Sequence, residues 1–260
     1  MEQGMPRIGT KRTTTPRKVL KYAHFYNNPP VIGIMLDGTQ TRDVANTSDT
    51  DHIRAGMVLG KVASSGKYAP WCVGVTTAAI AGSGTSITVA AATVTELVRR
   101  LGGTTGTGWL IGPAKTAGAA DALAERITIS NATGTTITVS AVTNAFIAGS
   151  VITCDDGTQD PLGILYGNNG YPVKVTDEDD SNITVGTNML IMGVYDESQL
   201  ITLPADSETK EWLRDKLKNS LAANLISDEV FSGSTLIETP SPTPTPTPSP
   251  SPTPTPTPTS

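Results

Sequence analysis

The chain has 260 residues, of which 17% are charged and 5% aromatic, and its net charge at pH 7 is -5. This length suffices for one large or two small domains that bury their own cores. The acidic balance argues against a general nucleic-acid-binding protein. Neither the N-terminal segment nor any later one contains an apolar run as long as a signal peptide or a membrane span requires. We therefore expect no membrane partner and a protein that stays in the cytoplasm where it is made.

Residues 1–30 form a polar segment that ends at Pro29-Pro30 and shows no apolar periodicity. We expect a flexible basic arm, because one acid, Glu2, faces six basic residues: Arg7, Lys11, Arg12, Arg17, Lys18 and Lys21. Such an arm can anchor the protein by becoming ordered on an acidic partner. It can equally be a merely solubilising tail.

From Val31 onward, short β-branched runs alternate with Gly, Asn, Asp and Pro, which predicts a mainly β fold. Three segments have helical features instead. Residues 93–103 place Leu97 and Leu101 at helical spacing before a Gly pair, and 117–126 is rich in Ala. Residues 207–225 repeat Leu every four positions and predict one C-terminal amphipathic helix.

One phrase occurs twice: GTSITVAAAT at 84–93 and GTTITVSAVT at 134–143, with a shorter echo, NITVGT, at 182–187. Each copy is typical of a strand entered from a turn, with Thr directed outward and Ile and Val inward. A duplicated ancestor and chance recurrence in a Thr-rich β protein both explain the repetition.

Candidate ligand and catalytic residues have weak support in the sequence. His24 and His52 lack a Cys or a second His at ligand spacing, so we predict no metal site. The acidic run from Asp177 resembles a calcium loop but lacks its Gly and its bidentate Glu, which favours a solvated turn over a weak cation site.

A second acidic cluster, Asp155, Asp156 and Asp160, surrounds Gly157. It could suggest a carboxylate pair for glycoside hydrolysis, but Asp-Asp-Gly is better explained as a turn. The segment GKVASSGK at 60–67 departs from the spacing of a phosphate-binding loop. We therefore predict no catalytic residue, no cofactor and no enzymatic activity.

Two longer segments resemble the lambda-type head decoration, or capsid cement, proteins of tailed bacteriophages. They are DHIRAGMVLGKVASSGKYAPW at 51–71 and DDGTQDPLGILYG at 155–167, followed by YPVKV and NMLIMGVYD. The resemblance extends over about residues 30–205, with an interruption in the middle. The matching positions are Gly56, Val58, Leu59, Gly60, Gly66, Lys67 and Tyr68, then Asp156, Gly157, Gly163, Ile164 and Leu165.

The resemblance implies a β-tulip or barrel-like core made of residues 31–72 and 154–205. It also implies a structural protein that trimerises at three-fold or quasi-three-fold sites on the outer surface of the expanded capsid. There it would bind the major capsid protein and stabilise the shell as part of the virion.

Three regions have no counterpart in a compact member of that family. Residues 73–153 would be an inserted β-rich lobe, flanked by Cys72 and Cys154, which we expect to lie close together. Within the helical segment 206–238, the side chains of Trp212, Leu213, Leu217 and Leu221 are candidate trimer contacts, unless the helix merely closes one end of the barrel. Residues 239–260 repeat Pro at every second position, which favours an extended tail projecting as a head fibre that could contact a host surface or glycan.

Two other functions compete with capsid decoration. A carbohydrate-binding or adhesin module would also be mainly β with a Pro-Thr stalk, but it would need a cluster of surface aromatics. Trp71, Trp109 and Trp212 lie in different predicted elements. An enzyme would need a convergent set of ionisable groups.

Overall fold

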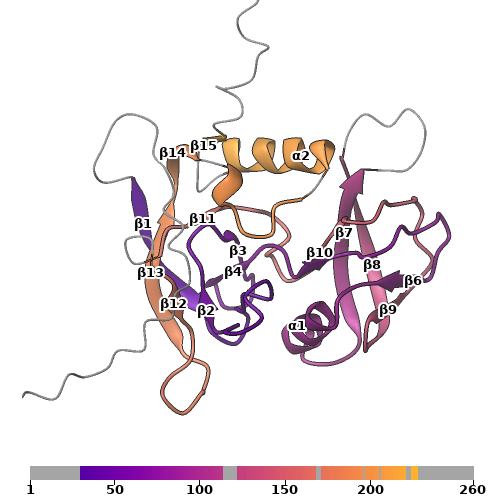
Figure 1. The fold of residues 1–260 in the computed structure, drawn as a ribbon, viewed down its shortest axis with the longest axis horizontal. Helices are drawn as coiled ribbons and strands as arrows, with labels where there is room; N and C mark the ends of the chain where they lie inside the picture. Colours follow the sequence, from indigo (N-terminus) through magenta and orange to yellow (C-terminus); the bar gives the residue numbers. More distant parts are fainter. Residues whose placement is uncertain are drawn as a thin grey trace, which may run out of the picture.

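The computed structural model describes residues 30–113, 122–167, 171–195, 197–204, 206–220 and 224–227. The described part is mainly β, as the sequence predicted, and contains a closed five-stranded barrel and a separate six-stranded sheet. Figure 1 shows the barrel and the sheet side by side, with helix α2 (Ser207–Lys218) lying across one side of both.

The barrel draws its strands from two distant parts of the chain. Its strand order is β1 (Val31–Asp37), β13 (Thr184–Leu190), β11 (Gly163–Leu165), β3 (Val58–Lys61) and β4 (Tyr68–Pro70). The longest ladder is antiparallel and pairs β1 with β13 from Val31↔Leu190 to Asp37↔Thr184. A parallel contact at Leu36↔Tyr68 closes the barrel. Alternate residues of β1, Ile34 and Leu36, are buried in its core.

Two small sheets accompany the barrel. In one, β2 (His52–Ile53) pairs with β12 (Val173–Lys174) in an antiparallel ladder. In the other, β14 (Met192–Tyr195) pairs with β15 (Asn224–Ser227) in a parallel ladder. The 3-10 turn η1 (Glu197–Gln199) lies between β14 and α2 in the chain.

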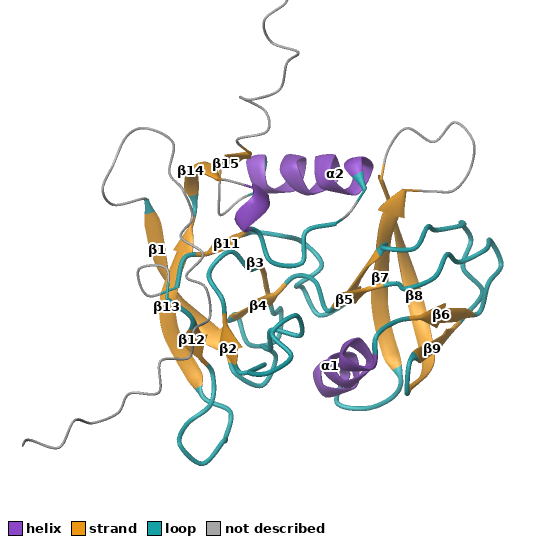
Figure 2. Ribbon diagram, viewed as in Figure 1, coloured by secondary structure: helices purple, strands orange, loops and turns teal. Residues whose placement is uncertain are grey.

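The six-stranded sheet is built entirely from residues 74–154. Its order is β5 (Gly74–Val75), β10 (Val151–Cys154), β7 (Gly106–Pro113), β8 (Ala122–Thr133), β9 (Thr136–Val139) and β6 (Ser86–Thr88). Figure 2 shows helix α1 (Ala91–Leu101) beside this sheet. The helix ends at Gly102, which has a left-handed φ of 69°; the Gly102 N–H donates to the Arg99 carbonyl and the Gly103 N–H to the Val98 carbonyl.

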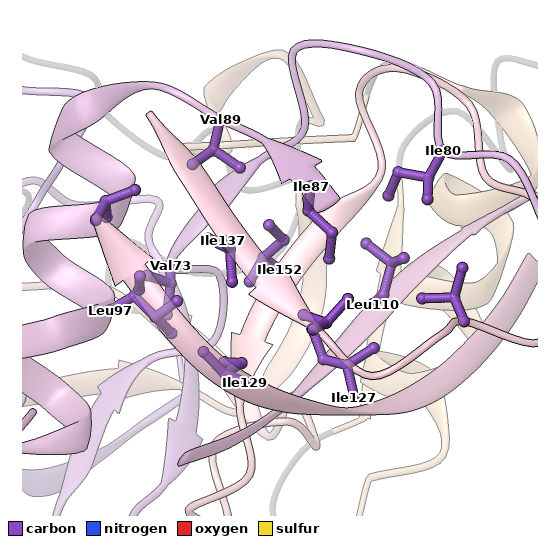
Figure 3. Packing of buried hydrophobic residues seen from close by; sticks show 14 of the residues in the cluster. Val73, Ile80, Ile87, Val89, Leu97, Leu110, Ile127, Ile129, Ile137 and Ile152 are labelled. Carbon is purple, nitrogen blue, oxygen red and sulfur yellow. The ribbon is translucent and has the colours of Figure 1, made fainter. Parts of the chain in front are cut away.

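The two full copies of the repeated phrase pair with each other. Strands β6 and β9 are antiparallel neighbours, with Ile87 opposite Ile137. Both Ile side chains are fully buried while Thr88 and Thr138 face outward, which confirms the predicted alternation. Figure 3 shows the two Ile residues in one apolar cluster with Leu110, Ile127 and Ile129.

The predicted pattern holds less well outside these two strands. The first copy stops being a strand at Thr88, and its second half begins α1 at Ala91. The third echo leads into β13 of the barrel, and its Ile183, just before that strand, is 37% exposed, so the alternation of the two full copies does not extend to it. The phrase therefore specifies a strand, while the surrounding sheet decides how much of it is used.

The helical predictions had mixed outcomes. Residues 93–103 are helical up to Leu101, as expected. The prediction for 117–126 is wrong from Ala122 onward, because this stretch forms β8 and pairs with β7 along eight positions. The ladder outweighs the modest helix propensity of a few Ala residues. The Leu-rich segment 207–225 is helical only over Ser207–Lys218, where the Asp206 side chain caps it by accepting the Thr209 N–H. The predicted helix is wrong at Asn224 and Leu225, because both belong to β15, which pairs in parallel with β14.

Candidate functional site

The two segments that carry the family resemblance lie against each other in the barrel. Strand β3 from the first pairs with β11 from the second, with Val58 opposite Ile164. Beyond the strands, the Leu162 N–H donates to the Leu59 carbonyl at 2.8 Å. The Ala63 N–H likewise donates to the Asp156 carbonyl at 2.7 Å. The resemblance thus rests on one continuous piece of structure rather than on two scattered motifs.

Glycines at the motif positions allow this close approach. A Cβ on Gly60 would lie 2.3 Å from the Thr158 carbonyl oxygen, and one on Gly157 would lie 2.4 Å from the Lys61 carbonyl oxygen. Gly157 also has a φ of 102°, which L side chains rarely adopt. Gly56 and Gly163 are similarly crowded, by the Gln199 carbonyl and the Met189 side chain. The glycines at these motif positions therefore allow neighbouring segments to pack closely.

The turn before β4 carries the next motif residues, Gly66, Lys67 and Tyr68. The Lys67 ammonium donates to Thr184 Oγ1 at 2.8 Å and so connects the turn to β13. In the same turn, Ser65 donates to the Asp37 carboxylate at 2.8 Å. Burial tends to raise the pKa of Asp37, but hydrogen bonds from Thr39 and Ser65 outweigh it and lower the pKa. The turn closes the barrel through polar contacts.

The acidic cluster at 155–160 is divided among separate partners. Asp155 accepts the Trp109 indole N–H at 2.8 Å and the Arg126 guanidinium at 2.6 Å. Burial tends to raise the pKa of Asp155, but these two bonds outweigh it and lower the pKa. Asp156 accepts the Thr158 N–H within the turn, as Asp-Asp-Gly predicted. Their side chains are engaged in turn and ion-pair contacts, in keeping with the turn interpretation.

The Leu side chains of helix α2 pack against other residues of the same chain. Leu213 and Leu217 are 1% and 0% exposed and belong to a cluster with Val58, Ile111 and Val151 from the barrel and the sheet. They therefore have no surface to offer another copy, which corrects their prediction as trimer contacts and favours the alternative that the helix closes the fold. Leu221 lies outside the described residues.

Trp212 lies on the same helix and is only partly buried. Its ring stacks on Trp71, with centroids 5.9 Å apart and an angle of 25° between the planes. Trp71 (just after β4), Trp109 (in β7) and Trp212 (in α2) do lie at different elements, as expected, but the fold brings Trp71 against Trp212. Residues 71 and 212 are too far apart in sequence for any local pattern to have shown it.

A groove of about 700 Å³ lies between α2 and the turn at 157–162. Trp212 and Pro161 line it together with polar residues, among them Asp215 and Asn219. The Lys216 ammonium lies 5.2 Å from the Trp212 ring centre and 3.6 Å from the Asp160 carboxylate. An aromatic ring surrounded by hydrogen-bonding groups can hold a ring-shaped polar ligand.

Arg100 of α1 connects the sheet to the barrel. Its fully buried guanidinium donates to the Gln40 carbonyl at 2.8 Å and to the Pro70 carbonyl at 2.6 Å. Cys72 and Cys154, both free and buried, lie within the electrostatic reach of this charge. Burial nevertheless raises the pKa of Cys72 to about 12 and that of Cys154 to about 11, so both thiols are protonated at neutral pH. That the two sulfurs lie close together remains a prediction.

Three further side chains converge that the sequence analysis did not group. The His52 Nδ1 lies 2.6 Å from Asp49 Oδ1 and 3.8 Å from Asp51 Oδ1. The partners of His52 are carboxylates rather than the Cys or second His whose absence predicted no metal site. The spacing Asp-x-Asp-His at 49–52 was the signal that could have found the group.

The six basic residues of the predicted arm and the Pro-Thr tail at 239–260 lie outside the described residues. Within the described ranges, none of the helices combines the length and apolarity that crossing a bilayer requires. Comparison with family models, with curated proteins and with solved structures found no match.

Proposed function

We propose that this chain is a non-enzymatic structural protein that decorates the outer surface of a tailed-phage capsid. The observation that carries the proposal is the joining of the two resembling segments, through β3, β11 and the Gly60 and Gly157 contacts. The two segments are separated by residues 72–154, yet they match one family and fold into one unit. A shared core explains this better than chance does. The finer elements of the proposal are a β-tulip core and trimerisation at three-fold or quasi-three-fold sites.

Attachment to the major capsid protein is assigned to the basic arm at 1–30. A positively charged segment that orders on an acidic shell can cover a large area while losing conformational entropy only upon binding. The described residues would then form the body of the decoration, and the tail at 239–260 would project as a head fibre.

Co-sedimentation with expanded, undecorated capsids from the same phage tests this function. The full chain should bind saturably, and removing residues 1–30 should weaken binding. A matched variant with all six basic residues of the arm changed to Gln separates charge from chain length. No binding by the full chain would overturn the proposal. Equal binding by the full chain, the truncated chain and the Gln variant would show that the arm is not the attachment site.

Trimerisation is tested separately by analytical ultracentrifugation of the free protein and by counting copies per three-fold site on decorated capsids. Three copies per site are expected. One isolated copy per site would contradict the trimer while leaving capsid binding intact.

Carbohydrate binding is the second candidate, and the groove beside Trp212 favours it. A saccharide could occupy this groove beside the indole, with Asp160, Asp215 and Asn219 as hydrogen-bonding partners. A glycan array and a saccharide titration followed by Trp fluorescence would test it. Asp215→Ala should abolish a genuine signal, whereas Glu178→Ala, an acid far along the chain, should not. A silent array would exclude this candidate.

A further inference from the structure

The group at Asp49, Asp51 and His52 has the composition and spacing of a metal site. One ligand atom from each of the three side chains lies within 4.8 Å of the other two. Ligands on one ion at about 2.1 Å are separated by roughly 3–4 Å, so small side-chain adjustments would bring all three into reach. Two carboxylates and a neutral imidazole together carry the charge that a divalent cation neutralises.

The backbone holds these three residues in fixed relation. His52 begins strand β2 and is opposite Lys174 of β12. The Asp51 carbonyl accepts the Val175 N–H at 3.0 Å, and the His52 N–H bonds to the Asp49 carbonyl. Asp49 is therefore brought to His52 by a tight turn, and Asp51 is fixed between them by its bond to Val175, at the end of the two-stranded β2–β12 sheet.

Asp51 also has a supporting partner. Its Oδ2 accepts a hydrogen bond from the Thr176 hydroxyl, which leaves Oδ1 directed toward His52. Hydrogen bonds of this kind, made to the second oxygen of a ligating carboxylate, orient metal ligands in established sites. Thr176 is buried at 5% exposure, so its hydroxyl is a fixed support.

Neighbouring cations are directed elsewhere. The Lys174 ammonium donates to the Asp177 carbonyl at 3.0 Å, although Lys174 is opposite His52 in the ladder. The Arg42 guanidinium donates to the carbonyls of Gly38 and Thr41 and to Asn182. The His52 Nδ1 thus lies within 4 Å of both carboxylates, and Arg42 adds only a longer-range attraction to Asp51.

We propose that Asp49, Asp51 and His52 bind one divalent transition-metal ion of the Zn²⁺ type. The mixed set of one imidazole nitrogen and two carboxylate oxygens suits Zn²⁺ and its first-row neighbours better than Ca²⁺, which prefers oxygen alone. The metal takes the place of the proton that His52 Nδ1 shares with Asp49, and that proton leaves to solvent. The ion would fix the conformation of the turn at 46–52 independently of capsid binding.

Calorimetric titration of the tag-free full chain with Zn²⁺ in a metal-free, weakly coordinating buffer tests the site. We expect one ion per chain, with at least tenfold weaker binding for His52→Gln and for Asp49→Asn. Thr176→Val should weaken binding about tenfold through Asp51 without removing a ligand. Asp179→Asn, which removes an acid from the other acidic turn, and His24→Gln are the matched controls and should bind as the parent does.

X-ray absorption of the zinc-loaded protein provides an independent readout and should show a single imidazole among oxygen ligands. Circular dichroism establishes that each variant is folded. If His52→Gln does not fold, the zinc affinity of Asp49→Asn and the number of imidazole ligands seen by X-ray absorption test the site instead. Absence of a saturable site, binding unchanged in both ligand variants, or loss of binding in His24→Gln would overturn the proposal and leave an ordinary His–Asp ion pair.

Discussion

The barrel and the six-stranded sheet reach stability by different means. The sheet buries a continuous cluster of Ile, Val and Leu side chains, in which β6 and β9 alternate outward Thr with inward Ile. The barrel combines its apolar core with buried polar side chains such as Asp37 and Asp43 and with backbone contacts at Gly60 and Gly157. The sheet core follows from local periodicity, whereas the barrel depends on contacts between segments far apart in the sequence.

The largest effect on stability is expected at Arg100, at the boundary between the sheet and the barrel. Arg100→Met should lower the free energy of unfolding by about 3 kcal/mol, because it removes the buried charge beside Glu96 and the donors to the Gln40 and Pro70 carbonyls. Urea denaturation measures the loss, and hydrogen exchange should show faster exchange in α1.

Arg99→Met is the matched control for this prediction. Its side chain is 24% exposed, and its hydrogen bonds go to Glu96 of the same helix. We expect a loss of about 1 kcal/mol or less. Equal losses for the two variants would show that Arg100 does not join the regions.

Helix α2 belongs to both regions, and Leu213→Ala tests that role. Truncating a side chain that is 1% exposed should cost about 3 kcal/mol. The sedimentation mass should stay unchanged, since Leu213 faces the chain's own core. Lys216→Ala, on the exposed side of the helix, should have little effect on unfolding. A fall in mass with unaltered stability would restore Leu213 as an intermolecular contact.

A pair of glycines sharpens the comparison directly. Gly157→Ala in the barrel combines a φ of 102° with a backbone clash and should cost about 2–3 kcal/mol. Gly134→Ala, in the β8–β9 turn of the sheet, has a φ of 59° but open space around its Cβ and should cost about 1 kcal/mol. Thermal unfolding of both variants measures the difference. Equal costs would mean that the close contact in the barrel relaxes without penalty.

The smallest expected effect is a dependence of stability on pH at the barrel side of α2. Burial tends to raise the pKa of Glu197, but hydrogen bonds from Arg214 and Ser227 outweigh it and lower the pKa. Because the folded pKa lies below the unfolded value, this contribution is complete above the ordinary pKa of 4.5 and is lost as the pH falls through the folded pKa.

Denaturation of Glu197→Gln against the parent across the acidic range measures this contribution. The difference in unfolding free energy should be largest near pH 7 and shrink below about pH 4.5. A difference that is constant with pH would show that the charge of Glu197 is not what stabilises the contact.

Sequence periodicity predicted the mainly β class, the alternation in β6 and β9 and the helix α1 before Gly102, because each depends on neighbours within a few residues. It failed at 122–126, where Ala-rich composition favoured a helix and the β7 ladder imposed a strand. It also failed at Leu213 and Leu217, since an apolar stripe predicts burial but does not name the surface that buries it.

Among the candidate sites, the sequence by itself determined the motif glycines and the turn chemistry of Asp156 and Gly157. Only the tertiary structure decided that Gly60 meets Thr158, that Trp212 stacks on Trp71, and that His52 faces two carboxylates. The physical reason is that backbone preferences are local, whereas close approach and side-chain convergence depend on how distant strands are paired.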